Sequence, residues 1–222
     1  MHPDQADSST DECALSVALR GVWRHFGERT VLRDLSCACS EGQTLVITGQ
    51  NGSGKSTVLK LIAGLLAPSA GEVSVKVDGA RQSLTMRRRH IAYVSPDLSL
   101  YNELTGAENM HFFARLKGVR LDDADLKDCL HAVGLKGRGR DVVGDYSTGM
   151  RQRLKYAVAL LGRPPIAVWD EPTTNLDSAG IEITRRLLQE QVRRVRGGLA
   201  ILATNNAHEE AWGDLALQLS PP

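Results

Sequence analysis

The segment GQNGSGKST, residues 49–57, has the composition and spacing of a phosphate-binding loop. It fits the pattern G-x-x-x-x-G-K-[ST] and lies between an apolar run, TLVITG, and a run with helical spacing. Glycines let backbone N–H groups approach phosphate oxygens, and the N-terminus of the following helix adds positive charge. We expect Lys55 to contact the terminal phosphates and Ser56 to offer a hydroxyl to Mg²⁺. The candidate nucleotide-binding residues of this loop are Gly49, Gln50, Asn51, Gly52, Ser53, Gly54, Lys55, Ser56 and Thr57.

Two adjacent acidic residues follow a second apolar run in the segment IAVWDEP, residues 166–172. A carboxylate at the end of a strand can hold Mg²⁺ through water, and this role is expected of Asp170. Glu171 is then placed to polarise or orient an attacking water molecule. A turn with acidic caps is the alternative interpretation. The phosphate-binding loop in the same chain favours the reaction site.

A third polar stretch, LATNNAHEE at 202–210, begins where another apolar run stops at Thr204. Ligands of open α/β sheets bind beyond the carboxyl ends of the strands, so Asn205 and Asn206 are candidates for the site. Asparagine is also one of the commonest turn residues. The stretch taken alone leaves both interpretations open.

The elements that must position these residues alternate between strand and helix patterns. Residues 14–47 alternate polar and apolar side chains as half-buried strands do, and the block 98–163 has helical spacing. Buried strands are expected at 44–49, 90–95, 165–170, 199–204 and 215–220, a further alternating strand at 71–79, and helices at 55–67 and 181–195. The pattern predicts an α/β fold with a parallel-sheet core, an antiparallel β flank and an inserted helical subdomain. With the phosphate-binding loop, the core is expected to be similar to that of P-loop NTPases (RecA-like). We expect a disordered leader over 1–12 and one domain over 13–220, with the helical subdomain at about 98–163.

Composition excludes several other classes of protein. The 222 residues are 42% hydrophobic and 24% charged with a net charge of +1, which argues against nucleic acid as a partner because such binding needs a basic stripe. No apolar run approaches the roughly 18 residues that span a bilayer, and the first residues do not form a secretory signal. The four cysteines, Cys13, Cys37, Cys39 and Cys129, form no CxxC pair, so we expect reduced thiols in a cytoplasmic protein.

A segment with a serine and a glycine, YSTGMRQRL at 146–154, leads into a predicted helix and is followed by DEPTTNLD. The order of a phosphate-binding loop, S-x-G-x-x-Q-R at a helix start and then DEPTTNLD resembles the nucleotide-binding domain of ABC transporters. The resemblance covers about residues 14–219. Within the family, the YSTGM variant and the compact length look like exporter-type systems, which include the small heme-exporter ATPases of cytochrome c maturation and drug- or polysaccharide-exporting systems.

The resemblance implies ATP and Mg²⁺ as cofactors and assigns roles to further residues. Phe26 matches the aromatic residue that stacks on adenine, with a core aromatic as the alternative and Trp23 as a weaker rival. Tyr146 to Met150, with Ser147, Thr148 and Gly149 as the binding candidates, match the signature segment, whose serine and glycine contact the γ-phosphate held by the opposite subunit. Asp177 matches the loop residue that communicates across the pair.

The same resemblance implies partners and a location. Two nucleotide-binding domains pair head to tail, as a homodimer or a heterodimer, and sandwich two ATP molecules. A transmembrane permease subunit docks on the helices around 101–117. The chain is then expected to be cytoplasmic, peripheral on the cytoplasmic side of the membrane.

Two positions depart from the family pattern. Pro96 stands where a glutamine usually contacts Mg²⁺ and the attacking water, and proline has no side-chain donor or acceptor for that role. The adjacent Asp97 either reaches the metal or is a loop residue, and both interpretations stay open. Asn205 stands where the family has a histidine that contacts the γ-phosphate; its amide can donate a hydrogen bond but cannot carry charge. Nucleotide binding should survive and hydrolysis should be slower, while His208 is expected to be a surface residue.

The leading hypothesis is therefore an ATP-binding, ATP-hydrolysing subunit that powers a separate permease, of exporter type. One alternative is a weakened ATPase that acts as a regulatory or pairing subunit beside an active homologue; an intact Glu171 argues for retained hydrolysis. Another is a soluble, non-transport ABC ATPase that acts on nucleic acid or the ribosome. The near-neutral charge and the lack of a second nucleotide-binding motif or zinc-ligand cysteines disfavour that alternative.

Overall fold

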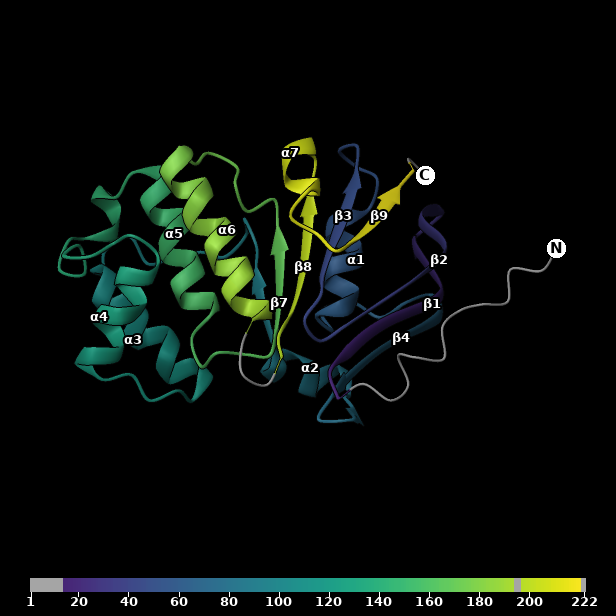
Figure 1. The fold of residues 1–222 in the computed structure, drawn as a ribbon, viewed down its shortest axis with the longest axis horizontal. Coiled ribbons are helices and arrows are strands. Elements are labelled where there is room, and N and C mark those ends of the chain that lie inside the picture. Colours follow the sequence, from purple (N-terminus) through teal and green to yellow (C-terminus); the bar gives the residue numbers. More distant parts are fainter. Residues whose placement is uncertain (1–13, 194–196, 221–222) are drawn as a thin grey trace.

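The computed structural model describes residues 14–193 and 197–220, so the predicted leader over 1–12 lies outside the described residues. Two sheets organise the described chain. The larger has five strands in the order β6-β7-β8-β3-β9, and the smaller has four in the order β2-β1-β4-β5. Figure 1 shows the sheets side by side, with a block of helices beyond the five-stranded sheet.

The five-stranded sheet is parallel and brings three strand ends together at one edge. Thr48 pairs with Thr204 and Asp170 pairs with Ala203, so the ends of β3, β7 and β8 are level. Nearly all side chains of these three strands are buried, as expected for strands covered on both faces. The strands are β6 (Ile91–Val94), β7 (Ile166–Asp170), β8 (Leu199–Thr204), β3 (Thr44–Gly49) and β9 (Leu215–Leu219).

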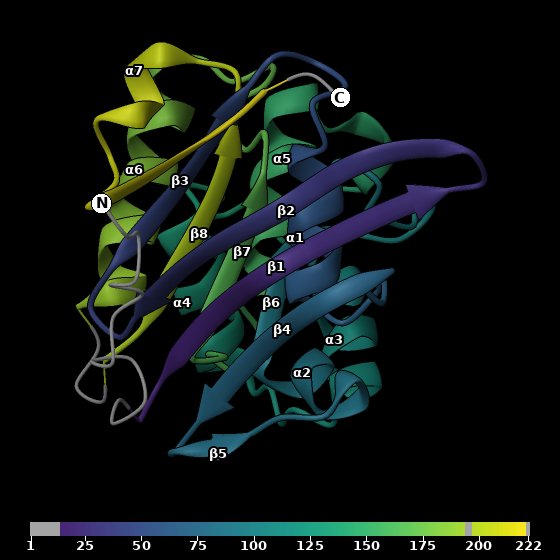
Figure 2. The same ribbon diagram turned by 90° about the vertical axis from the view of Figure 1, so that its right-hand side faces the viewer.

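The four-stranded sheet is antiparallel and is built around a long hairpin. Its first two strands are joined at Gly27, whose φ of 57° suits a residue without a Cβ. Figure 2 shows these two strands crossing in front of α1. The strands are β1 (Ser16–Phe26), β2 (Arg29–Ser40), β4 (Ala70–Val77) and β5 (Ala80–Arg81).

Helix α1 (Lys55–Ile62) lies between the sheets and contacts strands of both. Its buried residues, with those of the four-stranded sheet and one face of the parallel sheet, form one hydrophobic core. A second core joins the other face of the parallel sheet to helices on that side. The remaining helices are α2 (Leu84–His90), α3 (Gly106–Lys117), α4 (Asp123–Ala132), the short 3₁₀ helix η2 (Val143–Asp145), α5 (Thr148–Ala159), α6 (Ser178–Val192) and α7 (Ala207–Glu210).

The observed architecture confirms the predicted fold class, a parallel core with an antiparallel flank and helices. The predicted strands at 44–49 and 199–204 are found with those limits. The predicted helix over 55–67 was too long, because α1 ends at Ile62 and Gly64 then adopts a φ of 72°. The helix α2 and the strand β5 were not predicted. The limits of the helical subdomain stay a prediction. Among the described helices, none combines the length and apolar character that crossing a membrane requires.

Candidate functional site

The phosphate-binding loop connects β3 to α1 through two glycines that tolerate no side chain. Gly49 has a φ of 151°, and a Cβ built there would lie 2.6 Å from Ser53 Oγ and 2.7 Å from the Leu219 carbonyl oxygen. Gly54, at the N-cap of α1, has a φ of 101°, and its Cβ would lie 2.8 Å from Leu32 Cδ2. Any other residue would force these neighbours to move. The glycine spacing of the motif is therefore a packing requirement of this loop.

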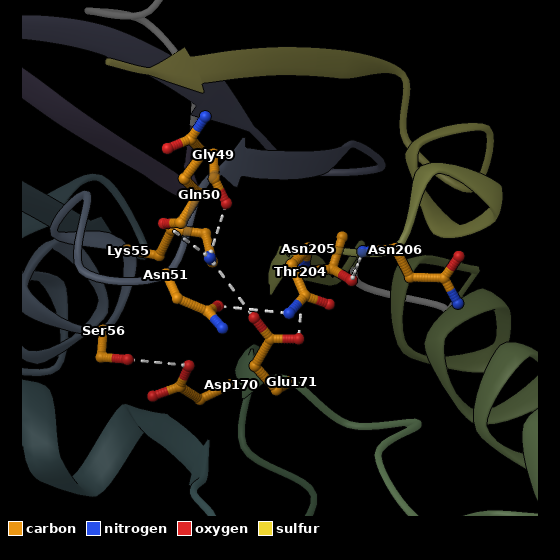
Figure 3. A network of polar contacts seen from close by, with 10 residues as sticks. All are labelled: Gly49, Gln50, Asn51, Lys55, Ser56, Asp170, Glu171, Thr204, Asn205 and Asn206. Carbon is orange, nitrogen blue, oxygen red and sulfur yellow. Dashed lines mark hydrogen bonds and ion pairs between the residues drawn. The ribbon is translucent and has the colours of Figure 1, made fainter. Parts of the chain in front are cut away.

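Lys55 is held inside the loop by its terminal ammonium group. Its side chain is 6% exposed, and Nζ donates to the Gly49 carbonyl oxygen at 2.8 Å and to that of Gln50 at 3.4 Å. The same Nζ lies 3.4 Å from Glu171 Oε1 (Figure 3). The predicted phosphate-contacting lysine and the predicted water-orienting glutamate are thus neighbours at the edge of the sheet.

Glu171 leaves the end of β7 in an unusual backbone conformation. Its φ is 47°, in the left-handed region that non-glycine residues rarely adopt. Its N–H donates to the Ala203 carbonyl oxygen at 2.9 Å, which ties the turn to β8. Strained backbone of this kind clusters at functional sites. Here it turns the chain sharply after the strand, and the carboxylate lies toward Lys55 (Figure 3).

The two asparagines after β8 have different surroundings. The backbone N–H of Asn205 donates to Glu171 Oε2 at 3.3 Å, and its Nδ2 donates to Asn51 Oδ1 at 3.2 Å. Asn206 instead caps α7, where its Oδ1 accepts from the backbone N–H of His208 at 3.0 Å. The structure therefore places Asn205 among the site residues and makes Asn206 a capping residue.

A hydroxyl and a carboxylate form a cluster suited to a hard cation. Ser56 Oγ donates to Asp170 Oδ1 at 3.0 Å, and the Tyr93 hydroxyl donates to Asp170 Oδ2 at 3.1 Å. Burial, and then the nearby charge of Asp170, raise the pKa of Tyr93. Among the described residues no group of three or more His, Cys, Asp or Glu side chains could hold a metal ion. Mg²⁺ needs no such group, since it is commonly bound through one or two protein oxygens, waters and substrate phosphates, and the oxygens of Ser56 and Asp170 fit it.

A pocket of about 570 Å³ opens above the phosphate-binding loop. Its volume is in the range of small-molecule sites. Phe26, at the end of β1, lies at its wall and is 45% exposed, so it is not a core aromatic. The Arg24 guanidinium carbon lies 4.4 Å from the centre of the Phe26 ring. The lining residues are Phe26, Arg29, Val31, Asn51, Gly52, Gly54, Lys55, Ser56, Thr57 and Glu171.

The predicted signature residues do not line this pocket in the described part of the chain. Ser147 Oγ caps α5 by accepting from the backbone N–H of Met150 at 3.2 Å, and Thr148 and Gly149 form the first turn of that helix. Asp177 caps α6 by accepting from the backbone N–H of Gly180 at 2.8 Å. These four residues therefore lie at the starts of two helices, α5 and α6, outside the pocket that Lys55 lines.

The Pro96–Asp97 segment is held by two lysines. The Pro96 carbonyl oxygen accepts from Lys155 Nζ on α5 at 2.7 Å. The Asp97 side chain is 83% exposed and lies 3.9 Å from Lys60 Nζ on α1. The Asp97 carboxylate therefore faces a lysine, and binding of Mg²⁺ by Asp97 stays a prediction.

Sequence reasoning missed several residues around the site. Arg29 and Val31 line the pocket from β2, and Tyr93 contacts Asp170 from β6. Tyr93 could have been found, since β6 ends beside β7 and an alternating side chain there can face the loop. Nothing in the sequence indicated that Glu209 is buried, because a charged residue in a short polar segment is ordinarily exposed.

Residues 32–174 match the family model described as ABC transporter. This chain belongs to the ABC transporter family. It is 35% identical over 193 residues to the uncharacterized ABC transporter ATP-binding protein YhcH of Bacillus subtilis, covering 86% of this chain and 62% of that protein. It is 31% identical over 189 residues to the cytochrome c biogenesis ATP-binding export protein CcmA of Haemophilus influenzae, covering 85% of this chain and 88% of that protein.

A solved structure extends the likeness to three dimensions. It is the dimeric structure of a post-hydrolysis state of an ATP-binding cassette bound to ADP and Pi, with a TM-score of 0.80 and 29% identity over 92% of this chain and 94% of that one. The predicted family, the fold class and an ATP-binding ATPase domain are thereby confirmed. The chain spans less than two thirds of the length of the Bacillus relative.

Proposed function

We propose that this chain binds ATP with Mg²⁺ and hydrolyses it to drive a separate membrane-spanning permease of exporter type. One observation carries the hydrolytic part of the proposal: Lys55 Nζ and the backbone N–H of Asn205 both contact the Glu171 carboxylate at the ends of three adjacent parallel strands. That edge is where ligands of open α/β sheets bind.

Each side chain has a task that its surroundings support. Lys55 neutralises charge on the terminal phosphates, and Glu171 orients the attacking water within reach of the same phosphate. Asp170 and Ser56 hold Mg²⁺, which when bound neutralises phosphate charge. Phe26 presents an exposed ring at the pocket wall for stacking with the base. The position of Asn205, bonded to Asn51, gives the γ-phosphate a neutral donor.

The signature residues lie outside the pocket, and this supports a site completed by a second subunit. Ser147, Thr148 and Gly149 start the 12-residue helix α5, and a helix N-terminus with free N–H groups suits an anion. A second nucleotide-binding domain, identical or homologous, would present this segment to the phosphate held by Lys55. Asp177 lies at another helix start, where it can contact the partner.

An exposed aromatic residue, Tyr101, and the partly buried Phe112 beside it support docking of a permease on α3. Tyr101 is 46% exposed, and its ring centre lies 4.7 Å from that of Phe112. A surface hollow of about 390 Å³ is lined by Glu108, His111, Phe112 and Arg115. Aromatic residues and arginine are enriched where proteins associate. Attachment to such a partner would place the chain on the cytoplasmic side of the membrane.

The hydrolytic proposal is tested by phosphate release from ATP at varied Mg²⁺. The purified chain should hydrolyse ATP with Mg²⁺, and Glu171→Gln should lower kcat at least about 100-fold while a fluorescent ATP analogue still binds. Glu182→Gln, an exposed glutamate on α6, is the matched control and should leave kcat unchanged. Full activity of Glu171→Gln would contradict the assignment.

The transport proposal is tested by purification from native membranes in mild detergent. We expect the chain to copurify with one multi-span protein, and Tyr101→Ser with Phe112→Ser should release it while leaving basal ATP hydrolysis unchanged. Retention on ribosomes or nucleic acid instead would favour the non-transport ATPase.

The changed residues Pro96 and Asn205 favour a second candidate, a weakened ATPase that pairs with an active homologue. In that case the isolated chain would bind ATP and hydrolyse it only when mixed with the homologue.

A further inference from the structure

A buried carboxyl group that has no role in the mechanism proposed above contacts the loops of the reaction site. Glu209, on α7, is 1% exposed. Its Oε1 accepts from the Thr173 hydroxyl and from Asn206 Nδ2, the latter at 3.3 Å. Its Oε2 is buried and has no hydrogen-bond partner among the described atoms. Burying a charge is costly unless it is paired and hydrogen-bonded, and here only one of the two carboxylate oxygens has hydrogen-bond partners among the described atoms.

The partners of Glu209 belong to the two loops that carry the reacting groups. Thr173 lies two residues after Glu171 in the loop that follows β7, and Asn206 directly follows Asn205 in the loop that follows β8. One carboxylate therefore joins both loops from behind. On the side facing the pocket, the same two loops are joined by the bond from the Asn205 N–H to Glu171 Oε2 at 3.3 Å.

The loop after β7 is anchored on its other side as well. The buried Tyr156 hydroxyl, from α5, donates to the Pro172 carbonyl oxygen, and the Tyr156 ring packs edge-on against Trp169 of β7 at 5.1 Å between centres. Residues 172 and 173 are thus fixed by α5 on one side and by Glu209 on the other. Loss of either anchor would let the Glu171 carboxylate move relative to Asn205.

Stability alone does not explain a carboxyl group at this position. Burial raises the pKa of Glu209, and its hydrogen bonds, those from Thr173 and Asn206 among them, only partly oppose that effect. The neighbouring charge of Glu171 raises it further. A methionine of similar volume would remove this penalty, as often holds where buried charges are replaced by apolar residues.

We propose that Glu209 is a positioning residue for ATP hydrolysis, which sets the spacing between Glu171 and Asn205 by holding Thr173 and Asn206 at once. It acts through those two loops and touches neither nucleotide nor metal. The inference rests on the proposed function, since it concerns the same reaction site. It predicts an effect on kcat that is separate from nucleotide affinity, because the phosphate-binding loop is anchored elsewhere, on β3 and α1.

The test compares kcat and ATP affinity across a small set of variants of the full chain. Glu209→Ala and Thr173→Val should each lower kcat about tenfold and change the Kd of a fluorescent ATP analogue less than twofold. Glu209→Gln keeps an acceptor oxygen and Thr173→Ser keeps the hydroxyl, so both should stay within about threefold of wild-type kcat. Glu210→Gln, an exposed neighbour on the same helix, is the matched control and should be unchanged.

The double variant Thr173→Val with Glu209→Ala separates positioning from general damage. If the two residues act through one contact, the kcat of the double variant should equal the kcat of the less active single variant. Multiplied losses, unchanged kcat in the single variants, or a loss confined to ATP affinity would each overturn the inference. If Glu209→Ala does not fold, as thermal unfolding would show, Thr173→Val against Thr173→Ser decides the same question.

The two proposals fail in distinguishable ways. A wild-type chain with no Mg²⁺-dependent hydrolysis, alone or with a homologue, overturns the proposed function and this inference with it. An active wild type whose Glu209→Ala and Thr173→Val variants are equally active overturns the inference alone.

Discussion

Replacing Asn205 by histidine should speed up ATP hydrolysis. The residue lies beside Glu171, with its backbone N–H on Oε2 at 3.3 Å and its side-chain amide on Asn51 at 3.2 Å. The side chain is exposed at the edge of the sheet, so a larger ring can be accommodated toward the pocket. A histidine can take a proton and present a charged donor to a phosphate, which an amide group cannot do.

The size of the effect follows from the two kinds of hydrogen bond. A neutral bond contributes roughly 0.5–1.5 kcal/mol, and a bond to a charged group roughly 1.5–3 kcal/mol. The difference is about 1–1.5 kcal/mol, and if it is realised in the transition state kcat rises about five- to thirteenfold. Loss of the bond to Asn51 affects the loop in both ground and transition states and should leave most of this gain.

The assay is steady-state phosphate release at saturating MgATP, with ATP affinity measured separately. Asn205→His should raise kcat and leave Kd within about twofold. His208→Asn, three residues further on at the exposed start of α7, is the control for general changes in histidine content and should have no effect. Asn205→Ala should not raise kcat, because it removes the donor. Equal turnover in wild type and Asn205→His, with both folded, would refute the reasoning that the missing charge limits the rate.

Three further predictions concern the cation, the thiols and pH. Tyr93→Phe removes the hydroxyl that donates to Asp170 at 3.1 Å. In titrations of nucleotide binding with Mg²⁺, the Mg²⁺ concentration that gives half of the maximal effect should rise about tenfold, and the affinity for nucleotide without Mg²⁺ should not change. Burial raises the pKa of Cys37 from 9.0 to about 11, so iodoacetamide at pH 7.5 should alkylate it about 100-fold more slowly in the folded than in the unfolded chain, and comparable rates would contradict this burial. Burial raises the pKa of Glu209 above 4.5, so the unfolded chain loses this proton at a lower pH than the folded chain does. Between these two pKa values, the free energy of unfolding of wild type should fall with rising pH relative to that of Glu209→Gln. Urea titrations at several pH values measure this difference, and a difference that does not change with pH would contradict the prediction.

The fold could be predicted from the sequence because local patterns and the global arrangement agree. The strand from Thr44 to Gly49 and the strand from Leu199 to Thr204 are short apolar runs bounded by polar residues, and both were found with the predicted limits. Helix limits were less predictable. Apolar spacing continues to residue 67, but Gly64 takes a left-handed conformation and ends α1 early.

The site could be predicted where one residue's chemistry suffices and not where partners are distant in the sequence. Lys55 and Glu171 were named from their motifs, and the structure brings them within 3.4 Å. The contact between Asn51 and Asn205 spans 154 positions, and no local pattern encodes it. The left-handed φ of Glu171 was equally inaccessible, because it arises from tertiary anchoring to β8.

We expect the two departures from the family pattern to affect catalysis more than binding. The groups expected to hold phosphate, Lys55 and the glycines of its loop, are positioned by β3 and α1, and Lys55 Nζ donates to two carbonyl oxygens of the loop. Pro96 and Asn205 lie in the loops after β6 and β8, on either side of Asp170 and Glu171. Asn205 reaches the phosphate-binding loop only through its bond to Asn51, so we expect substitutions at these positions to act mainly on how the water and the γ-phosphate are held. Affinity for ATP and the rate of its hydrolysis should therefore respond to different residues in this chain, and variants at 205 and 209 should change the second without the first.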